Sequence, residues 1–391
     1  MSASKQLLAR ILWLVALLCS GAPATRGVIL FGTEGNTTPP TEELADSGWQ
    51  YQGVWGDFLG TPIAPRFFLT AAHIGNPGVL VYNGISYTVI RTIFDPAESD
   101  LRLYEVSTAF PTFAPLYTSH DEVGKPLVVF GRGTQRGEPI LFGAENELRG
   151  WYHGGGAGTR RWGTNTVTGV VADGPDDELL YASFDAGVSP NEAHLSGGDS
   201  GGGTFIQEGG VWKLAGINYA IDGPFSPDGS DAKKFDAAFF DASDFYLRTQ
   251  EHPPVYTFLP GPGPVPSAFY TTRISSRTGW LYSVTDPLGD LDADGTPNLG
   301  EYGQHLDPAA ADVSQVPQLG REGDALTLTY RKRTTATDLR YLVESSQDLA
   351  SWSPAGAQEQ IVSTEGTVQT IKATVPISGG RLFLRLRIAR P

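Results

Sequence analysis

The chain has 391 residues, of which 48 are glycine and 28 are proline, and its formal net charge at pH 7 is −15. This length allows two or three domains with a full core, and the turn-rich composition without long apolar helical runs favours an all-β fold. The strong negative charge excludes nucleic acid and acidic membrane surfaces as partners.

Residues 1–24 have the pattern of a secretory signal peptide. Lys5 and Arg10 precede the apolar run 11–18, and a small-x-small cleavage motif follows. The run is too short for a membrane span, so we expect a secreted, extracellular or cell-surface associated protein without membrane insertion. Removing Lys5 and Arg10 takes the net charge from −15 to −17. The single cysteine, Cys19, also lies in this segment, so the mature chain would contain no disulfide.

Two stretches in the first third of the chain place polar side chains at strand ends. Residues 67–73 are an apolar run that ends in small residues and His73. In the stretch 99–104, Asp100 stands just before an alternating strand. Between them, residues 79–90 predict a β-hairpin on an Asn-Gly turn. Neither stretch alone identifies a function.

The stretch Gly197-Gly198-Asp199-Ser200-Gly201-Gly202 is suited to acyl transfer. Such a reaction needs an exposed serine hydroxyl and backbone N–H groups that face a developing oxyanion. The glycines permit a tight turn, and the carboxylate of Asp199 could hold that turn in shape. A plain surface turn is the alternative, because Gly, Asp and Ser are common turn residues.

The same stretch also matches G-x-S-x-G, the nucleophile elbow of α/β-hydrolases. That fold requires a core strand before the serine, and an acidic residue and a histidine after it. Residues 191–196 are polar and unlike a strand, while His252 and His305 lie beside a proline-rich stretch and an acidic loop. We therefore reject the elbow interpretation.

Taken together, the TAAH segment ending at His73, the Asp-Leu-x-Leu segment at Asp100 and the GDSGG segment around Ser200 resemble the trypsin-like (chymotrypsin-fold) serine proteases of the bacterial secreted type. The resemblance covers roughly residues 27–286 and implies two six-stranded antiparallel β-barrels with a C-terminal helix. The implied site residues are His73, Asp100 and Ser200 for catalysis, the N–H groups of Gly198 and Ser200 for the oxyanion hole, and Asp199 as a structural support.

The resemblance extends to an activation segment and a substrate pocket. Residues 26–30 resemble the site where a freed N-terminus pairs with the residue before the nucleophile; Gly27 departs from the family pattern, and constitutive activity is the alternative. The pocket wall would lie near Asn218 to Ile221 with His194 at the pocket floor, where the histidine either recognises an acidic or polar side chain or turns outward. Residues 222–266 either extend the substrate cleft or form an insertion without a role in substrate binding.

A terminal helix is implied after the pocket. Tyr270, Ile274, Leu281 and Val284 fall at helical spacing and would form one docking face. We expect the protease domain to end near this helix.

Residues 290–301 fit the 12-residue calcium loop, with acidic residues at positions 1, 3 and 5, glycine at 6 and glutamate at 12. Pro287 and Gly289 disfavour a long entering helix, so the loop resembles the half-EF-hands of dockerins and bacterial linkers. An acidic solvated linker is the alternative. The expected ligands of a structural Ca²⁺ ion are Asp290, Asp292, Asp294, the carbonyl of Thr296, Asn298 through water, and Glu301. We expect modest affinity, about 10⁻⁴–10⁻³ M, and largely retained activity after chelation.

Period-2 runs in residues 313–391 predict a small β-sandwich. The predicted division is 1–24 signal peptide, 25–286 protease domain, 287–312 calcium-loop linker and 313–391 accessory domain. The expected function is that of a monomeric, secreted serine endopeptidase that acts on protein or peptide substrates and needs no cofactor for catalysis. The alternative is a catalytically inactive adhesion or binding protein on a protease-like scaffold, which the presence of all three catalytic residue types disfavours.

Overall fold

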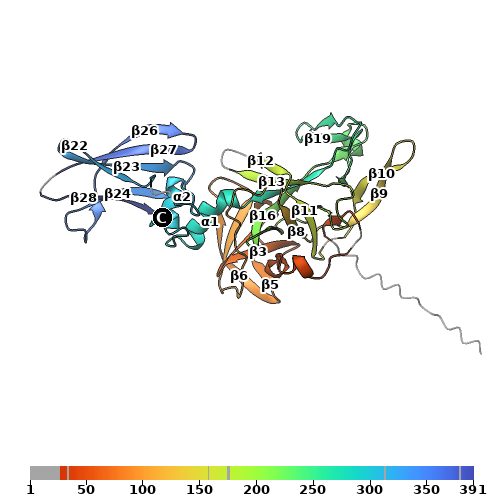
Figure 1. The fold of residues 1–391 in the computed structure, drawn as a ribbon, viewed down its shortest axis with the longest axis horizontal. Coiled ribbons are helices and arrows are strands. Elements are labelled where there is room, and N and C mark those ends of the chain that lie inside the picture. The colour runs from red at the N-terminus through yellow and green to blue at the C-terminus, as the bar shows by residue number, and fades with distance from the viewer. Residues whose placement is uncertain (1–26, 33–34, 157, 174–176, 312–313, 378–379) are drawn as a thin grey trace, which may run out of the picture.

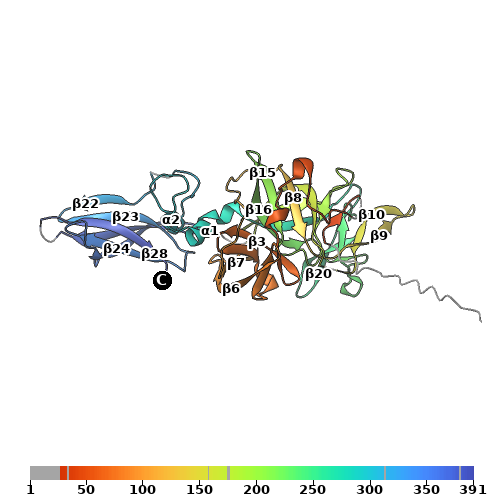
Figure 2. The same cartoon turned by 90° about the horizontal axis from the view of Figure 1, so that it is seen from below.

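The computed structural model describes residues 27–32, 35–156, 158–173, 177–311, 314–377 and 380–391. Most of its elements are antiparallel strands, and the short helices α1 (Thr278–Thr285) and α2 (Asn298–Gln304) lie between a larger and a smaller β unit (Figure 1). A view turned by 90° shows the same arrangement (Figure 2). The expectation of a mainly β protein is confirmed. The predicted signal peptide lies outside the described residues.

The larger unit begins with a closed barrel in the order β2-β3-β4-β7-β6-β5. Its strands are β2 (Gly53–Trp55), β3 (Phe58–Ala64), β4 (Phe67–Ala71), β5 (Val79–Tyr82), β6 (Ile85–Phe94) and β7 (Leu101–Val106). The buried rings of Trp55, Phe68 and Tyr104 pack with centroids 4.8–5.2 Å apart. Strands β5 and β6 pair from Tyr82 opposite Ile85, so the predicted hairpin is confirmed.

A seven-stranded antiparallel sheet follows, in the order β11-β8-β15-β16-β21-β13-β12. Its strands are β8 (Pro126–Gly131), β11 (Arg161–Thr166), β12 (Gly169–Ala172), β13 (Glu178–Ser183), β15 (Gly203–Glu208), β16 (Val211–Ile221) and β21 (Ala268–Arg273). Strands β11 and β12 stand at its two edges, so the predicted second closed barrel is not confirmed. The Ser200 turn leads directly into β15.

A satellite lobe sits on this sheet, and the segment 222–266 contributes most of it. Two three-stranded sheets build the lobe: β9 (Arg136–Phe142), β10 (Glu147–His153) and β18 (Ala237–Phe239), then β17 (Phe225–Ser226), β19 (Tyr246–Gln250) and β20 (Val255–Phe258). The rings of Phe225, Phe239 and Phe245 form its separate apolar core. A two-stranded pair, β1 (Ile29–Leu30) and β14 (Ala193–His194), lies beside the lobe.

The predicted terminal helix begins later than expected. Tyr270 belongs to strand β21, where it lies opposite Tyr181 of β13 and Ala220 of β16. Hydrogen bonding to strands on both sides favours the extended backbone over the helical pattern of this stretch. A 3-10 turn, Ser275–Arg277, follows, and the helix itself is α1.

The smaller unit consists of a four-stranded and a three-stranded antiparallel sheet. Its strands are β22 (Gln318–Glu322), β23 (Ala325–Arg333), β24 (Arg340–Ser346), β25 (Ser353–Pro354), β26 (Gln358–Glu365), β27 (Val368–Pro376) and β28 (Phe383–Ala389). Tyr330, Val343 and Ile371 belong to one apolar cluster to which both sheets contribute. We call residues 314–391 the C-terminal module.

One apolar cluster joins the two β units. It contains Phe130 and Phe205 of the seven-stranded sheet, Trp280 of α1, Tyr302 of α2, and Ala336 from the turn between β23 and β24. Part of the segment predicted as a linker is therefore helix α2, whose Tyr302 is only 2% exposed. Among the described residues, no helix is long and apolar enough to cross a membrane.

Candidate active site

Three polar side chains from three separate loops meet at one point. His73 lies in the 3-10 turn Ala72–Ile74 after β4, Asp100 stands just before β7, and Ser200 stands in the turn before β15. The imidazole Nδ1 of His73 lies 2.7 Å from Asp100 Oδ2, and its Nε2 lies 2.9 Å from Ser200 Oγ. The imidazole therefore bridges the carboxylate and the hydroxyl.

Strand pairing sets the relation of His73 to Asp100. Ala71 of β4 lies opposite Leu101 of β7, and the Ala72 N–H continues the ladder by donating to the Asp100 carbonyl at 2.8 Å. The His73 N–H then donates to Asp100 Oδ1 at 2.9 Å. The His73 side chain is 42% exposed and that of Asp100 only 12%. The imidazole can thus meet a ligand while its carboxylate partner is largely withdrawn from water.

The carboxylate of Asp199 holds the serine turn from inside the protein. It is 1% exposed and accepts N–H groups of Gly133 at 2.6 Å, Ser196 at 2.7 Å and Val28 at 3.2 Å. Burial raises the pKa of Asp199 to about 6, and these hydrogen bonds oppose the shift. Val28, whose N–H is one of these donors, belongs to the segment that resembles an activation site.

Gly198 and Ser200 carry two backbone N–H groups in the turn before β15. Gly198 has φ of +96°, a conformation that a side chain would strain. Within the described chain, neither the Gly198 N–H nor the Ser200 N–H donates to a protein acceptor. Two unpaired donors in one turn are the arrangement that an oxyanion requires.

A small cavity of about 150 Å³ opens beside Ser200. Its walls are the segment from Leu195 to Gly197 and the end of β16 from Asn218 to Ile221. The Asn218 amide is buried in the wall, donating to the carbonyls of Phe130 at 2.7 Å and Asp199 at 3.0 Å. Asp199 is the one charged residue along the described wall, and its carboxylate accepts the N–H groups of Gly133 and Ser196. The cavity is therefore small and presents no free charge.

His194 is not at the floor of this cavity, so that prediction is wrong. Its side chain is fully buried behind the wall, with Nδ1 2.6 Å from the Leu195 carbonyl and Nε2 3.1 Å from Ser267 Oγ. Phe184 and Phe269 pack against the ring at centroid distances of 5.7 and 6.3 Å. Pairing of β14 with β1 turns the histidine into the core, and burial lowers its pKa to about 3.

A second cavity, of about 590 Å³, lies on the other side of His73. Asp100, Tyr219 and Thr337 are among its lining residues. Tyr219 also lines the small cavity, and its ring centroid lies 6.1 Å from that of His73. Tyr219 falls within the segment predicted as the pocket wall, whereas Thr337 was not predicted. No motif marks Thr337, which lies in the β23–β24 turn of the C-terminal module.

The predicted calcium loop brings its aspartates together. One carboxylate oxygen each from Asp290, Asp292 and Asp294 lie within 4.8 Å of one another. Glu301 is fully buried beside them, and neither of its carboxylate oxygens has a hydrogen-bond partner in the described chain. Burial and the charges of the three aspartates raise the pKa of Glu301 to about 8. These residues suit a hard cation, since an uncompensated buried carboxylate is costly.

Two other predicted calcium ligands lie in the same loop and the helix after it. The Thr296 N–H donates to Asp294 Oδ1 at 2.8 Å, which closes the turn at Gly295. Asn298 is buried at the start of α2, and its Oδ1 is a further oxygen without a partner in the described residues.

Comparisons with known proteins add likenesses of structure only. No protein-family model matches the chain, and no curated protein sequence matches it. Among solved structures, it is similar to neuropsin, a serine protease expressed in the limbic system of mouse brain, at 17% identity and a TM-score of 0.36 over 64% of this chain and 100% of that chain. It is also similar to the passenger domain of plasmid encoded toxin, an autotransporter enterotoxin from enteroaggregative Escherichia coli, at 14% identity and a TM-score of 0.36 over 62% of this chain and 23% of that chain. At these values the likenesses assign no function.

The burial of His194 predicts an acid-sensitive fold. Its native pKa of about 3 lies below the unfolded value of 6.5, so the unfolded chain binds the proton first and stability falls as pH drops below 6.5. Between pH 7 and pH 5 this group should remove about 2 kcal/mol of unfolding free energy. Denaturant unfolding of wild type and His194→Gln at both pH values measures the difference. Equal pH dependence of the two proteins would contradict a buried neutral histidine.

Proposed function

We propose that this chain is a secreted serine endopeptidase of the trypsin-like type, with two β-barrels, a calcium loop and a C-terminal β-sandwich. The observation that carries the proposal is the bridge from Asp100 through His73 to Ser200, in which Nδ1 lies 2.7 Å from Asp100 Oδ2 and Nε2 lies 2.9 Å from Ser200 Oγ. A hydroxyl, an imidazole and a carboxylate in this order are the parts of acyl transfer to serine. Protein or peptide substrates follow from that chemistry.

Each residue then has a defined task. Ser200 Oγ attacks the carbonyl carbon of the scissile bond while His73 Nε2 takes its proton. Asp100 holds the imidazole in the required tautomer and stabilises its charged form. The imidazolium returns the proton to the leaving amine, which leaves an acyl-enzyme on Ser200. A water molecule, deprotonated by His73, then hydrolyses the ester and frees the serine.

The Gly198 and Ser200 N–H groups would bind the oxyanion of each tetrahedral intermediate. Their lack of protein acceptors in the described structure supports this role. The loss of one such donor typically costs about 3 kcal/mol of transition-state stabilisation. Asp199 contributes indirectly, because its hydrogen bonds to Gly133 and Ser196 fix the turn that carries both donors.

The triad assignment predicts the behaviour of two variants. Ser200→Ala and His73→Ala should each lower peptidase kcat by on the order of 10⁶-fold and should abolish labelling by diisopropyl fluorophosphate. Ser86→Ala, an exposed serine on β6, serves as the control and should keep wild-type turnover and labelling. A folded Ser200→Ala protein with wild-type turnover would refute the proposal.

The small uncharged cavity predicts a preference for small apolar side chains before the scissile bond. In a peptide-library cleavage profile, Ala and Val should therefore exceed Arg, Glu and Trp. Ile221→Ala enlarges the cavity and should shift the preference toward Leu and Phe by roughly 10-fold. Ile85→Ala, at a site remote from the cavity and 55% exposed, is the matched control. Best cleavage after a charged residue in the wild type would contradict the assignment of this cavity.

We further propose that the loop 290–301 binds a structural Ca²⁺ ion. Asp290, Asp292 and Asp294 would supply the hard oxygen ligands that this ion prefers, together with Glu301. The unpaired, fully buried carboxylate of Glu301 is the observation that favours a cation over a solvated acidic linker. The ion would hold the loop against α2, and catalysis would proceed without it as a reactant.

Calcium binding is testable by calorimetry, by thermal unfolding and by resistance to proteolysis. We expect a Kd of about 10⁻⁴–10⁻³ M, a higher melting temperature with Ca²⁺, and faster proteolytic cutting within residues 287–310 after chelation. Glu301→Gln should weaken binding at least 10-fold, whereas Glu251→Gln, at an exposed site in the satellite lobe, should not. The absence of wild-type binding at millimolar Ca²⁺ would rule out the site.

A further inference from the structure

The loop that carries Asp100 is tied to a buried ion pair. The side chain of Asp95 is 1% exposed and that of Arg277 is 2% exposed, and the guanidinium contacts both carboxylate oxygens. Asp95 is the first residue of this loop and directly follows β6. Arg277 lies in the 3-10 turn before α1. Both contacts come from Nη2 of the guanidinium, and the positive charge compensates a carboxylate that is withdrawn from water.

Asp95 organises the residues that lead to Asp100. Its Oδ1 accepts the N–H of Ala97 at 3.1 Å, and its Oδ2 accepts the hydroxyl of Ser99 at 2.5 Å. The Ser99 hydroxyl oxygen in turn accepts the N–H of Leu101 at 3.3 Å. Ser99 precedes Asp100 and Leu101 follows it. The hydrogen bond of Asp95 to Ser99 and that of Ser99 to Leu101 therefore hold the backbone on both sides of Asp100.

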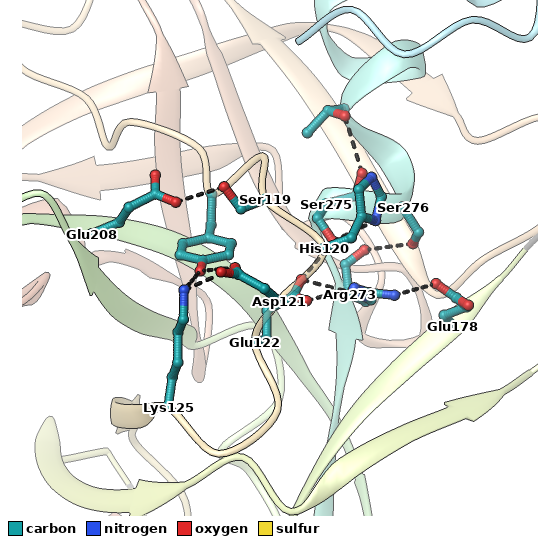
Figure 3. A network of polar contacts seen from close by, with 12 residues as sticks. Ser119, His120, Asp121, Glu122, Lys125, Glu178, Glu208, Arg273, Ser275 and Ser276 are labelled. Atoms are coloured by element: carbon teal, nitrogen blue, oxygen red, sulfur yellow. Dashed lines mark hydrogen bonds and ion pairs between the residues drawn. The ribbon is translucent and has the colours of Figure 1, made fainter. Parts of the chain in front are cut away.

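Arg277 is itself held in place by a second polar network, shown in Figure 3. Arg273 lies between Glu122, whose Oε1 is 2.9 Å from its Nε, and Glu178, whose Oε2 is 2.7 Å from its Nη1. The Ser275 hydroxyl donates to the same Glu122 carboxylate at 2.5 Å. The Arg277 N–H then donates to the Ile274 carbonyl at 2.8 Å. The turn that presents Arg277 is therefore anchored at its start.

Apolar packing anchors the other end of that turn. Ile274 and Trp280, on either side of Arg277, belong to the cluster that also contains Tyr302 of α2 and Ala336 of the C-terminal module. The guanidinium is thus held by elements that follow the barrel in sequence, while its carboxylate partner belongs to the barrel. The ion pair joins two parts of the chain 182 residues apart.

We propose that Arg277, Asp95 and Ser99 are positioning residues for Asp100, so that a network anchored outside the barrel aligns the carboxylate with His73. This inference rests on the proposed endopeptidase function and adds residues that act through Asp100. Asp95 and Ser99 line the larger cavity next to His73. Misalignment of Asp100 would leave His73 poorly oriented in the transition state. Substrate binding in the small cavity beside Ser200 would be unaffected, because Asp95 and Ser99 do not line it.

The test replaces the Ser99 hydroxyl, which leaves the ion pair in place. Ser99→Ala should lower kcat by about 10- to 100-fold with KM changed less than about twofold, since small displacements of a catalytic group cost this much. Ser99→Thr keeps the hydroxyl and should restore most of kcat. Ser86→Ala on the barrel surface is the matched control. A Ser99→Ala kcat within twofold of the wild type, or a change in KM alone, would overturn the proposal.

A spectroscopic readout separates positioning from loss of stability. The proton shared between His73 Nδ1 and Asp100 should give a downfield proton resonance, identified by its absence in His73→Ala. It should shift or broaden in Ser99→Ala and in Arg277→Lys, which keeps the charge but replaces the planar guanidinium with an ammonium group. It should be unchanged in Ser99→Thr and Ser86→Ala. An unchanged resonance in a folded Ser99→Ala protein would overturn the proposal.

The outcome also distinguishes this inference from the function on which it rests. A wild-type protein without peptidase activity or diisopropyl fluorophosphate labelling would refute the endopeptidase assignment itself. An active wild type with an equally active Ser99→Ala variant would refute only the positioning role. Where Arg277→Lys does not fold, the Ser99 pair decides the question, because neither Ser99 substitution leaves a buried charge unpaired.

Discussion

The structure depends on one continuous apolar cluster that joins the barrel, the seven-stranded sheet, the two helices and the C-terminal module. Leu59 of the barrel, Phe130 of the seven-stranded sheet, Trp280 of α1 and Tyr302 of α2 all belong to it. Close packing transmits small displacements, so side chains on different elements keep fixed distances only where the elements share a core. His73, Asp100 and Ser200 come from three loops, and it is this shared core that keeps their loops in register.

The buried carboxylates of Asp95, Glu122 and Asp199 are stabilised in two different ways. Asp95 and Glu122 each face a guanidinium, from Arg277 and Arg273, which compensates the loss of hydration. Asp199 has only hydrogen-bond donors of neutral groups around it, and its pKa is raised to about 6 by burial. Ion pairs therefore fix the framework behind Asp100, while dipoles fix the turn that carries Ser200.

The sequence was informative where chemistry is local. The Asn-Gly turn predicted the β5–β6 hairpin, and the spacing of acidic residues grouped Asp290, Asp292 and Asp294. The motifs around His73, Asp100 and Ser200 indicated residues that the structure brings within hydrogen-bond distance. Each of these patterns extends over a few residues whose own backbone or charge determines the outcome.

Long-range pairing decided the features that the sequence did not indicate. His194 occupies a loop position in the sequence, yet Phe184, Ser267 and Phe269 enclose it, and none of these is a sequence neighbour. Tyr270 has helical spacing to Ile274, but strands on both sides of β21 impose an extended backbone. The sequences around Arg277 and Asp95 do not predict the contact between them, because the packing of α1 brings these two residues together.

The contacts of Arg390 bear on when during synthesis the protein becomes complete. Its guanidinium donates to the Ser283 carbonyl at 2.7 Å and the Ser283 hydroxyl at 3.0 Å, and pairs with Asp338 at 2.8 Å. Arg390 follows Ser283 by 107 residues, so helix α1 lacks this partner until the ribosome has added them. A nascent chain that already carries His73, Asp100 and Ser200 therefore still lacks the contacts that fasten α1. This contact therefore forms only after the C-terminal module has been synthesised.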